Sequence, residues 1–174
     1  MGTAVARLQE PYTEDGQMSS KVLVSLRVPV DPLSAFDAFT REIGSWWRSN
    51  GLFAVTAEGD GTLAFEPCAG GRLWTTLASG AQFEIGRISL WEPGARLIFS
   101  WRQASFTPAQ STEVEVRFEG VGAETRISVE HRAWDTIPQH HVARHGFPEH
   151  STLQHVADWW RASLNALKIG LLPS

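Results

Sequence analysis

The chain has 174 residues, of which 43% are hydrophobic and 20% charged, so it fits one ordinary globular domain and not a disordered or collagen-like chain. A formal net charge of −4 argues against nucleic acid and anionic membranes as partners. Cys68 is the only cysteine, which excludes an intrachain disulfide, and residues 1–20 contain no apolar run typical of a signal peptide or membrane helix. We therefore expect a cytoplasmic protein.

The first twenty residues are polar and show no periodicity, so we expect a flexible N-terminal arm there and one folded domain over residues 21–174. Valine or leucine then recurs at every second position from Val22 to Val30, which is the pattern of a strand. Asp31 and Pro32 follow as an N-cap residue and a proline at the first helical position, and they predict a short helix.

A break follows this helix at Gly44 and again at Asn50–Gly51, and the Trp46–Trp47 pair between them fits a second short helix. Two interpretations of the tryptophan pair are open. The rings close one end of a ligand cavity, or they are a plug in the hydrophobic core.

Residues 62–133 contain short runs of strand-forming residues that are separated by turn residues. No stretch between these runs is long enough for a helix. This pattern predicts an antiparallel meander. Gly86, inside one run, is typical of a bulge that helps a sheet to curve. The expected strands are Thr62–Glu66, Gly71–Leu77, Gln82–Trp91, Arg96–Arg102, Thr112–Glu119 and Glu124–Ala133.

The last expected element is a long helix. Ser151 and Gln154 match a capping box at its start, and Gly170 and Pro173 mark its end. Apolar residues at three- and four-residue steps form one face of this helix: Leu153, Val156, Trp160, Leu164 and Leu167.

Four segments carry a resemblance to a known family: Gly70–Trp74, Phe83–Ile88, Trp91–Pro93 and Arg96–Trp101. With the element order, they make the chain resemble the activator-of-heat-shock-protein-90-ATPase-homologue family of the SRPBCC, or START-like, superfamily. The resemblance implies an α+β helix-grip fold, in which a curved antiparallel sheet of roughly seven strands surrounds a long C-terminal helix, with two short helices after the first strand. It also implies a cavity between sheet and helix, and relatives that bind, carry or transform hydrophobic small molecules.

We therefore expect the chain to bind an apolar or aromatic small molecule without a cofactor, and an enzyme acting on such a molecule is the alternative. The chain contains no dinucleotide fingerprint, phosphate loop or nucleophile elbow. The family name also suggests a chaperone-associated stress-response module. The additional large N-terminal domain of full-length cochaperones is not in this sequence, so we expect a chaperone partner less than a small-molecule ligand.

Tryptophan is the outlier of the composition, with eight residues against a single tyrosine. The rings either fill core volume, or several of them line a cavity for a planar or apolar ligand. Trp159 lies about 100° around the last helix from Trp160. It packs at the flank of that helix or, if exposed, belongs to the self-association surface of a homodimer.

Alternation along the strands places particular side chains on the inner face of the sheet. Phe99 shares a face with Trp101, and His131 shares one with Val129, while Trp160 on the last helix should face them. The candidate ligand-binding residues are Trp47, Phe83, Phe99, Trp101, Phe118, His131, Trp160 and Leu164.

His131 is the one candidate catalytic residue. A neutral imidazole on an apolar wall can orient a polar ligand group or act as a general base, with Glu84 or another carboxylate as its partner. The alternative is a histidine that is simply hydrogen-bonded within the core.

The six histidines are concentrated in one part of the chain, between His131 and His155. His141 and His145 would share a helical face and could hold a metal, but the prolines and glycine around them argue against a helix, and we favour no metal. The segment Asp135–His150 is long for a connection, so we expect it to border the cavity mouth, where titrating histidines would make binding depend on pH.

Overall fold

The computed structural model describes residues 21–173, and the arm expected at residues 1–20 lies outside these described residues. The strands are β1 (Val22–Val28), β2 (Thr62–Phe65), β3 (Arg72–Thr76), β4 (Gln82–Glu92), β5 (Arg96–Trp101), β6 (Thr112–Val121) and β7 (Glu124–Arg132). The helices are α1 (Pro32–Arg41), α2 (Ile43–Trp46) and α3 (Glu149–Leu171), with two 3₁₀ turns, η1 (Trp134–Thr136) and η2 (Val142–Arg144), before α3.

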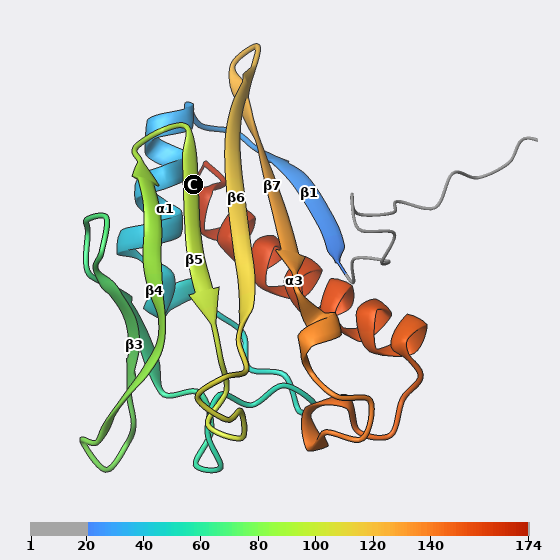
Figure 1. Cartoon of the computed structure of the whole chain (residues 1–174). Helices are drawn as coiled ribbons and strands as arrows, with labels where there is room; N and C mark the ends of the chain where they lie inside the picture. Colours follow the sequence, from blue (N-terminus) through green and yellow to red (C-terminus); the bar gives the residue numbers. More distant parts are fainter. Residues whose placement is uncertain (1–20, 174) are drawn as a thin grey trace, which may run out of the picture.

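The seven strands form one antiparallel sheet in the order β1-β7-β6-β5-β4-β3-β2. The first strand, β1, pairs with the last, β7, and the two edge strands of the sheet are β1 and β2. Strands β2 to β7 follow the chain order as a meander. Figure 1 shows the sheet curled into a half-barrel with α3 lying across its inner face and α1 beside it. The α+β helix-grip fold expected from the sequence is therefore confirmed.

Irregularities in β4 bend the sheet. The register between β3 and β4 shifts at Leu73/Trp74, and the register between β4 and β5 shifts at Ile88/Leu90. A Cβ atom at Gly86 would lie 1.7 Å from the carbonyl oxygen of Ser100 on β5. Only glycine allows this approach of the two backbones, which explains why it stands inside a strand.

The two main helices begin differently. Asp31 caps α1 as expected, because its carboxylate accepts a hydrogen bond from the Ser34 amide at 3.2 Å. The expected capping box at Ser151 is wrong: α3 begins two residues earlier, at Glu149, after Pro148. Pro148 has a φ of −58°, and its carbonyl oxygen accepts the Thr152 amide at 3.0 Å, so the proline starts the helix without a side-chain cap.

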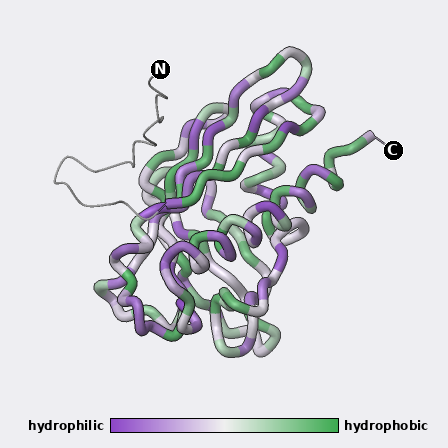
Figure 2. The backbone as a smooth tube through the Cα atoms, turned by 90° about the vertical axis from the view of Figure 1, so that its right-hand side faces the viewer, coloured by the Kyte–Doolittle hydropathy of each residue, from purple (hydrophilic) through white to green (hydrophobic). Residues whose placement is uncertain are grey.

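The two faces of the sheet differ in chemistry, and Figure 2 shows the alternation of hydrophobic and hydrophilic residues along the strands. The inner face is apolar and packs on the helices. On the outer face Glu115 is only 3% exposed because Arg96, Arg117 and Arg132 surround it. Burial alone would raise the pKa of Glu115, but hydrogen bonds from these arginines outweigh it and lower the pKa from 4.5 to about 2.

None of the helices within residues 21–173 is both long and apolar enough to cross a membrane.

Candidate functional site

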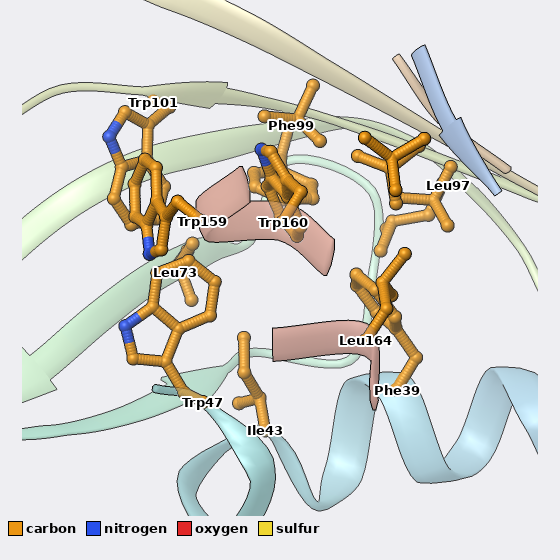
Figure 3. Close-up of a cluster of buried hydrophobic side chains, with 14 of the residues drawn as sticks. Phe39, Ile43, Trp47, Leu73, Leu97, Phe99, Trp101, Trp159, Trp160 and Leu164 are labelled. Atoms are coloured by element: carbon orange, nitrogen blue, oxygen red, sulfur yellow. The ribbon is translucent and has the colours of Figure 1, made fainter. Parts of the chain in front are cut away.

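Four tryptophans meet between the sheet and α3, and we call them the aromatic cluster: Trp47, Trp101, Trp159 and Trp160. Each is at most 8% exposed. The ring centre of Trp47 lies 5.2 Å from that of Trp101, 5.3 Å from Trp159 and 5.6 Å from Trp160. Figure 3 shows the rings converging from the end of α2, from β5 and from α3. The space where the sequence suggested a cavity wall is thus filled by the rings themselves.

The other candidate ligand-binding residues lie around this cluster. Phe99 packs edge-on against Phe65 at 5.2 Å, and Phe118 lies under α1 against Phe36 at 5.2 Å. Leu164 is fully buried on α3. Phe83 stands apart near the start of β4, half-buried, with the Arg102 guanidinium carbon 4.9 Å from its ring centre.

Burial also decides the role of Trp159. It is 1% exposed, and its ring stacks on Phe53 at 5.3 Å while its Nε1 donates to the Arg48 carbonyl oxygen at 3.3 Å. The self-association surface that an exposed Trp159 would have formed is therefore not available in this fold.

His131 is fully buried near the end of β7, and both of its ring nitrogens are engaged. Trp160 Nε1 donates to His131 Nδ1 at 3.0 Å, so the neutral ring carries its proton on Nε2. That nitrogen lies 2.7 Å from Thr112 Oγ1, which donates in turn to the Trp101 carbonyl oxygen at 3.2 Å. The hydrogen bonds form one directed chain from the helix through the imidazole to β5.

Burial lowers the pKa of His131 from 6.5 to about 3, because the charged form would lose its hydration. The imidazole is therefore neutral at physiological pH. Glu84, the carboxylate considered as its partner, is instead paired with Arg87 at 2.9 Å. A general-base role would require His131 Nδ1 to give up its bond from Trp160, and the enzyme hypothesis stays a prediction.

The histidine-rich segment is fastened to two neighbouring loops. His141 Nδ1 accepts from the Ala143 amide at 3.0 Å, and its Nε2 donates to the Ser105 carbonyl oxygen at 3.1 Å. His145 Nε2 donates to the Leu52 carbonyl oxygen. Within the described part of the chain, no group of three or more His, Cys, Asp or Glu side chains is placed to hold a metal.

These contacts surround a hollow of about 450 Å³, which we call the loop pocket. Figure 1 shows the three contributing loops gathered beyond the arrowhead of β5. Small and aliphatic residues form most of its wall, and segments 135–150, 51–57 and 103–105 all contribute. Its lining is Gly51, Leu52, Ala54, Val55, Thr56, Ala57, Gln103, Ala104, Ser105, Val142, Ala143 and His145.

Two polar residues at this end of the fold are buried without complete hydrogen bonding. Gln103 lines the loop pocket, is 3% exposed, and its Nε2 has no partner. Arg144 is 3% exposed, and its Nη1 has no partner either. Sequence reasoning missed both, because a charged or amide side chain in a polar connection is expected to be exposed.

A second hollow lies over the outer face of β2 and β3, around Trp74. Trp74 is half-buried and carries the Arg72 guanidinium 5.5 Å from its ring centre. Its neighbours Leu73 and Thr75 are buried on the inner face, so Trp74 lies on the outer face of the sheet. None of the residues lining this second hollow has a buried unpaired polar atom.

Residues 29–171 match the family described as Activator of Hsp90 ATPase homolog 1-like protein. A comparison with curated proteins finds none that matches the chain.

Solved structures share the fold at low sequence identity. Protein MLL2253 from Mesorhizobium loti is 16% identical with a TM-score of 0.60, over 86% of this chain and 94% of that one. CalU16 from Micromonospora echinospora is 19% identical with a TM-score of 0.59, over 94% and 82%. PFC0360w from Plasmodium falciparum, described as an HSP90 activator, is 16% identical with a TM-score of 0.62, over 87% and 96%.

Proposed function

Because the chain belongs to the Activator of Hsp90 ATPase homolog 1-like family, we propose that it binds an apolar or aromatic small molecule, and that the ligand occupies the loop pocket. The observation that carries the proposal is the hollow itself, which has an aliphatic wall and about 450 Å³ of space beside the aromatic cluster. This volume falls within the range of about 300–1,000 Å³ that is usual for small-molecule sites.

The aromatic cluster supports the loop pocket from behind. Phe53 lies between the pocket residues Leu52 and Ala54 and stacks on Trp159, with an angle of 23° between the rings. A rigid wall of this kind keeps the hollow open without ligand and reduces the entropy lost on binding. Direct contact of the ligand with Trp101 or Trp160 would require these packed rings to separate, so it stays a prediction.

Titration with N-phenyl-1-naphthylamine, a neutral apolar fluorophore whose emission rises in apolar surroundings, tests the proposal. We expect saturable binding with one molecule per chain. Val142 lines the loop pocket and is 69% exposed, so Val142→Trp should fill the hollow and weaken binding about tenfold or more without disturbing the core.

Ile169→Trp is the matched control, since Ile169 is 61% exposed on α3 and does not line the loop pocket. This variant should bind the fluorophore like the parent chain. An absence of saturable binding, or equal loss in both variants, contradicts the proposal.

A chaperone-associated role is the second candidate, and the structural similarity to PFC0360w, described as an HSP90 activator, favours it. Trp159 is buried, so the outer face of the sheet is the surface available for contact. Leu23 on β1 is 65% exposed there, beside the charged side chains around Glu115. Retention of Hsp90 by the immobilised chain, lost in Leu23→Glu and kept in Ile169→Glu, would support this role. No retention would exclude it.

A further inference from the structure

Buried donors without acceptors gather at one end of the fold. Within residues 21–173, five buried side-chain atoms have no hydrogen-bond partner, and four are N–H donors at the loop end of the sheet: Trp101 Nε1, Gln103 Nε2, Trp134 Nε1 and Arg144 Nη1. Buried polar groups in folded proteins are nearly always paired. An excess of donors in one place therefore indicates a missing acceptor.

Gln103 is the donor that borders open space. It follows β5 after one residue, and its own carbonyl oxygen accepts the Phe106 amide at 2.9 Å, which holds the turn in place. The side chain is 3% exposed and lines the loop pocket, and its Nε2 atom is unpaired. An acceptor placed in the loop pocket would satisfy this amide, while a purely apolar occupant would leave it unpaired.

Arg144 adds a buried positive charge between two residues that line the loop pocket, although it is not itself a lining residue. Its Nε donates to the Ile137 carbonyl oxygen at 2.9 Å and its Nη2 donates to the Trp134 carbonyl oxygen at 2.6 Å. Its neighbours Ala143 and His145 both line the loop pocket. No carboxylate within residues 21–173 forms an ion pair with Arg144. A buried guanidinium held only by neutral carbonyls lacks a counter-charge.

Three ionisable side chains near the loop pocket are already hydrogen-bonded. His141 and His145 use their Nε2 atoms to hold the Ser105 and Leu52 carbonyl oxygens. The buried carboxylate of Asp60 accepts from the Val55 amide at 2.9 Å and from Trp47 Nε1 at 3.0 Å. Both Asp60 oxygens thus already accept a hydrogen bond, and no described residue pairs with Gln103 Nε2, so an occupant of the loop pocket is the acceptor that we consider.

We infer that the natural ligand of the loop pocket carries a carboxylate on an apolar or aromatic body. This inference rests on the proposed function and names its ligand class. The apolar body packs against the aliphatic wall around Val55, and a carboxylate oxygen accepts from Gln103 Nε2. The buried charge of Arg144 attracts the same group, because electrostatic attraction is strong where water is excluded.

Two ligands of nearly equal shape test the inference at pH 7.5, where 2-naphthoate is ionised and 2-naphthalenemethanol is neutral. Each is titrated calorimetrically against the full chain and also as a competitor of N-phenyl-1-naphthylamine. We expect 2-naphthoate to bind about tenfold or more tightly than the alcohol. Gln103→Leu, which keeps the side-chain size and removes the donor, should abolish most of this preference.

The outcomes separate the two proposals. Equal affinity for acid and alcohol overturns the carboxylate inference and leaves the proposed function standing. Binding of neither ligand, with no bound fluorophore, overturns the proposed function and this inference with it. Arg144→Met should also reduce the preference for the acid. If circular dichroism shows that this variant is unfolded, the comparison of Gln103→Leu with the parent chain decides.

Discussion

The aromatic cluster and the loop pocket are neighbouring regions that differ in how their space is filled and in how their polar groups are paired. In the cluster, the rings of Trp47, Trp101, Trp159 and Trp160 fill the space between sheet and helix, and the one buried imidazole beside them is bonded at both nitrogens. In the loop pocket, space is left open and the buried donor of Gln103 is unpaired. The difference teaches that the densely packed aromatic region makes this fold rigid. The loops beside it contain the open space and the buried donor without a hydrogen-bond partner.

Removing a ring from the cluster should have the largest effect on stability. Trp160→Ala should lower the free energy of unfolding by about 3–5 kcal/mol, because it creates a cavity and leaves His131 Nδ1 without its donor. Denaturation in urea measures the loss. Trp160→Phe should lose less, since a ring remains, and a loss below about 1 kcal/mol in the alanine variant would contradict the packed cluster.

As the pH falls, the stability contributed by His131 beside the aromatic cluster should be lost before the stability contributed by Glu115 on the outer face of the sheet. His131 has a lowered pKa of about 3 in the folded state against 6.5 unfolded, so its contribution is complete above pH 6.5 and is lost as the pH falls toward 3. The slope should approach about 1.4 kcal/mol per pH unit below pH 6. Glu115, whose pKa falls from 4.5 to about 2, adds to the loss only below pH 4.5.

Urea denaturation across this range checks the prediction. His131→Leu should flatten the profile between pH 6.5 and 4.5 and keep the decline below pH 4.5. A variant that retains the full slope in the upper window would show that another group causes it.

The hydrogen-bond chain through His131 can be broken at its far end. Thr112→Val preserves the side-chain shape but leaves His131 Nε2 without its acceptor, so it should cost about 1–3 kcal/mol of unfolding free energy. Thr107→Val, at an exposed position in the loop before β6, should change stability by less than about 0.5 kcal/mol. Equal losses of unfolding free energy in the two variants would contradict the proposed contribution of the hydrogen bonds through His131.

The smallest effect is expected at the loop pocket. His141→Ala removes the bonds to Ser105 and Ala143 and should cost about 0.5–1 kcal/mol, expressed as faster hydrogen exchange of the amides of η2. His140→Ala, at an exposed neighbouring position, serves as the control. Unchanged exchange in His141→Ala would show that the imidazole does not hold the loop.

Local patterns were sufficient for most of the fold. The alternation in β1 and the Asp31–Pro32 start of α1 were predicted within two residues, because period and capping depend on neighbours in the chain. Strand parity also placed His131 on the inner face. The start of α3 was predicted two residues too late, since a capping box and a proline both fit there and the backbone used the proline.

The sequence by itself therefore determined the order of the elements and the inner faces of β5, β6 and β7, which follow from the geometry of a single segment. Only the tertiary structure decided whether the tryptophans enclose a cavity or fill it, and whether Arg144 is exposed or buried. Those outcomes depend on volumes and hydrogen bonds shared by segments far apart in the chain, such as Trp47 with Trp160, and no local pattern encodes them.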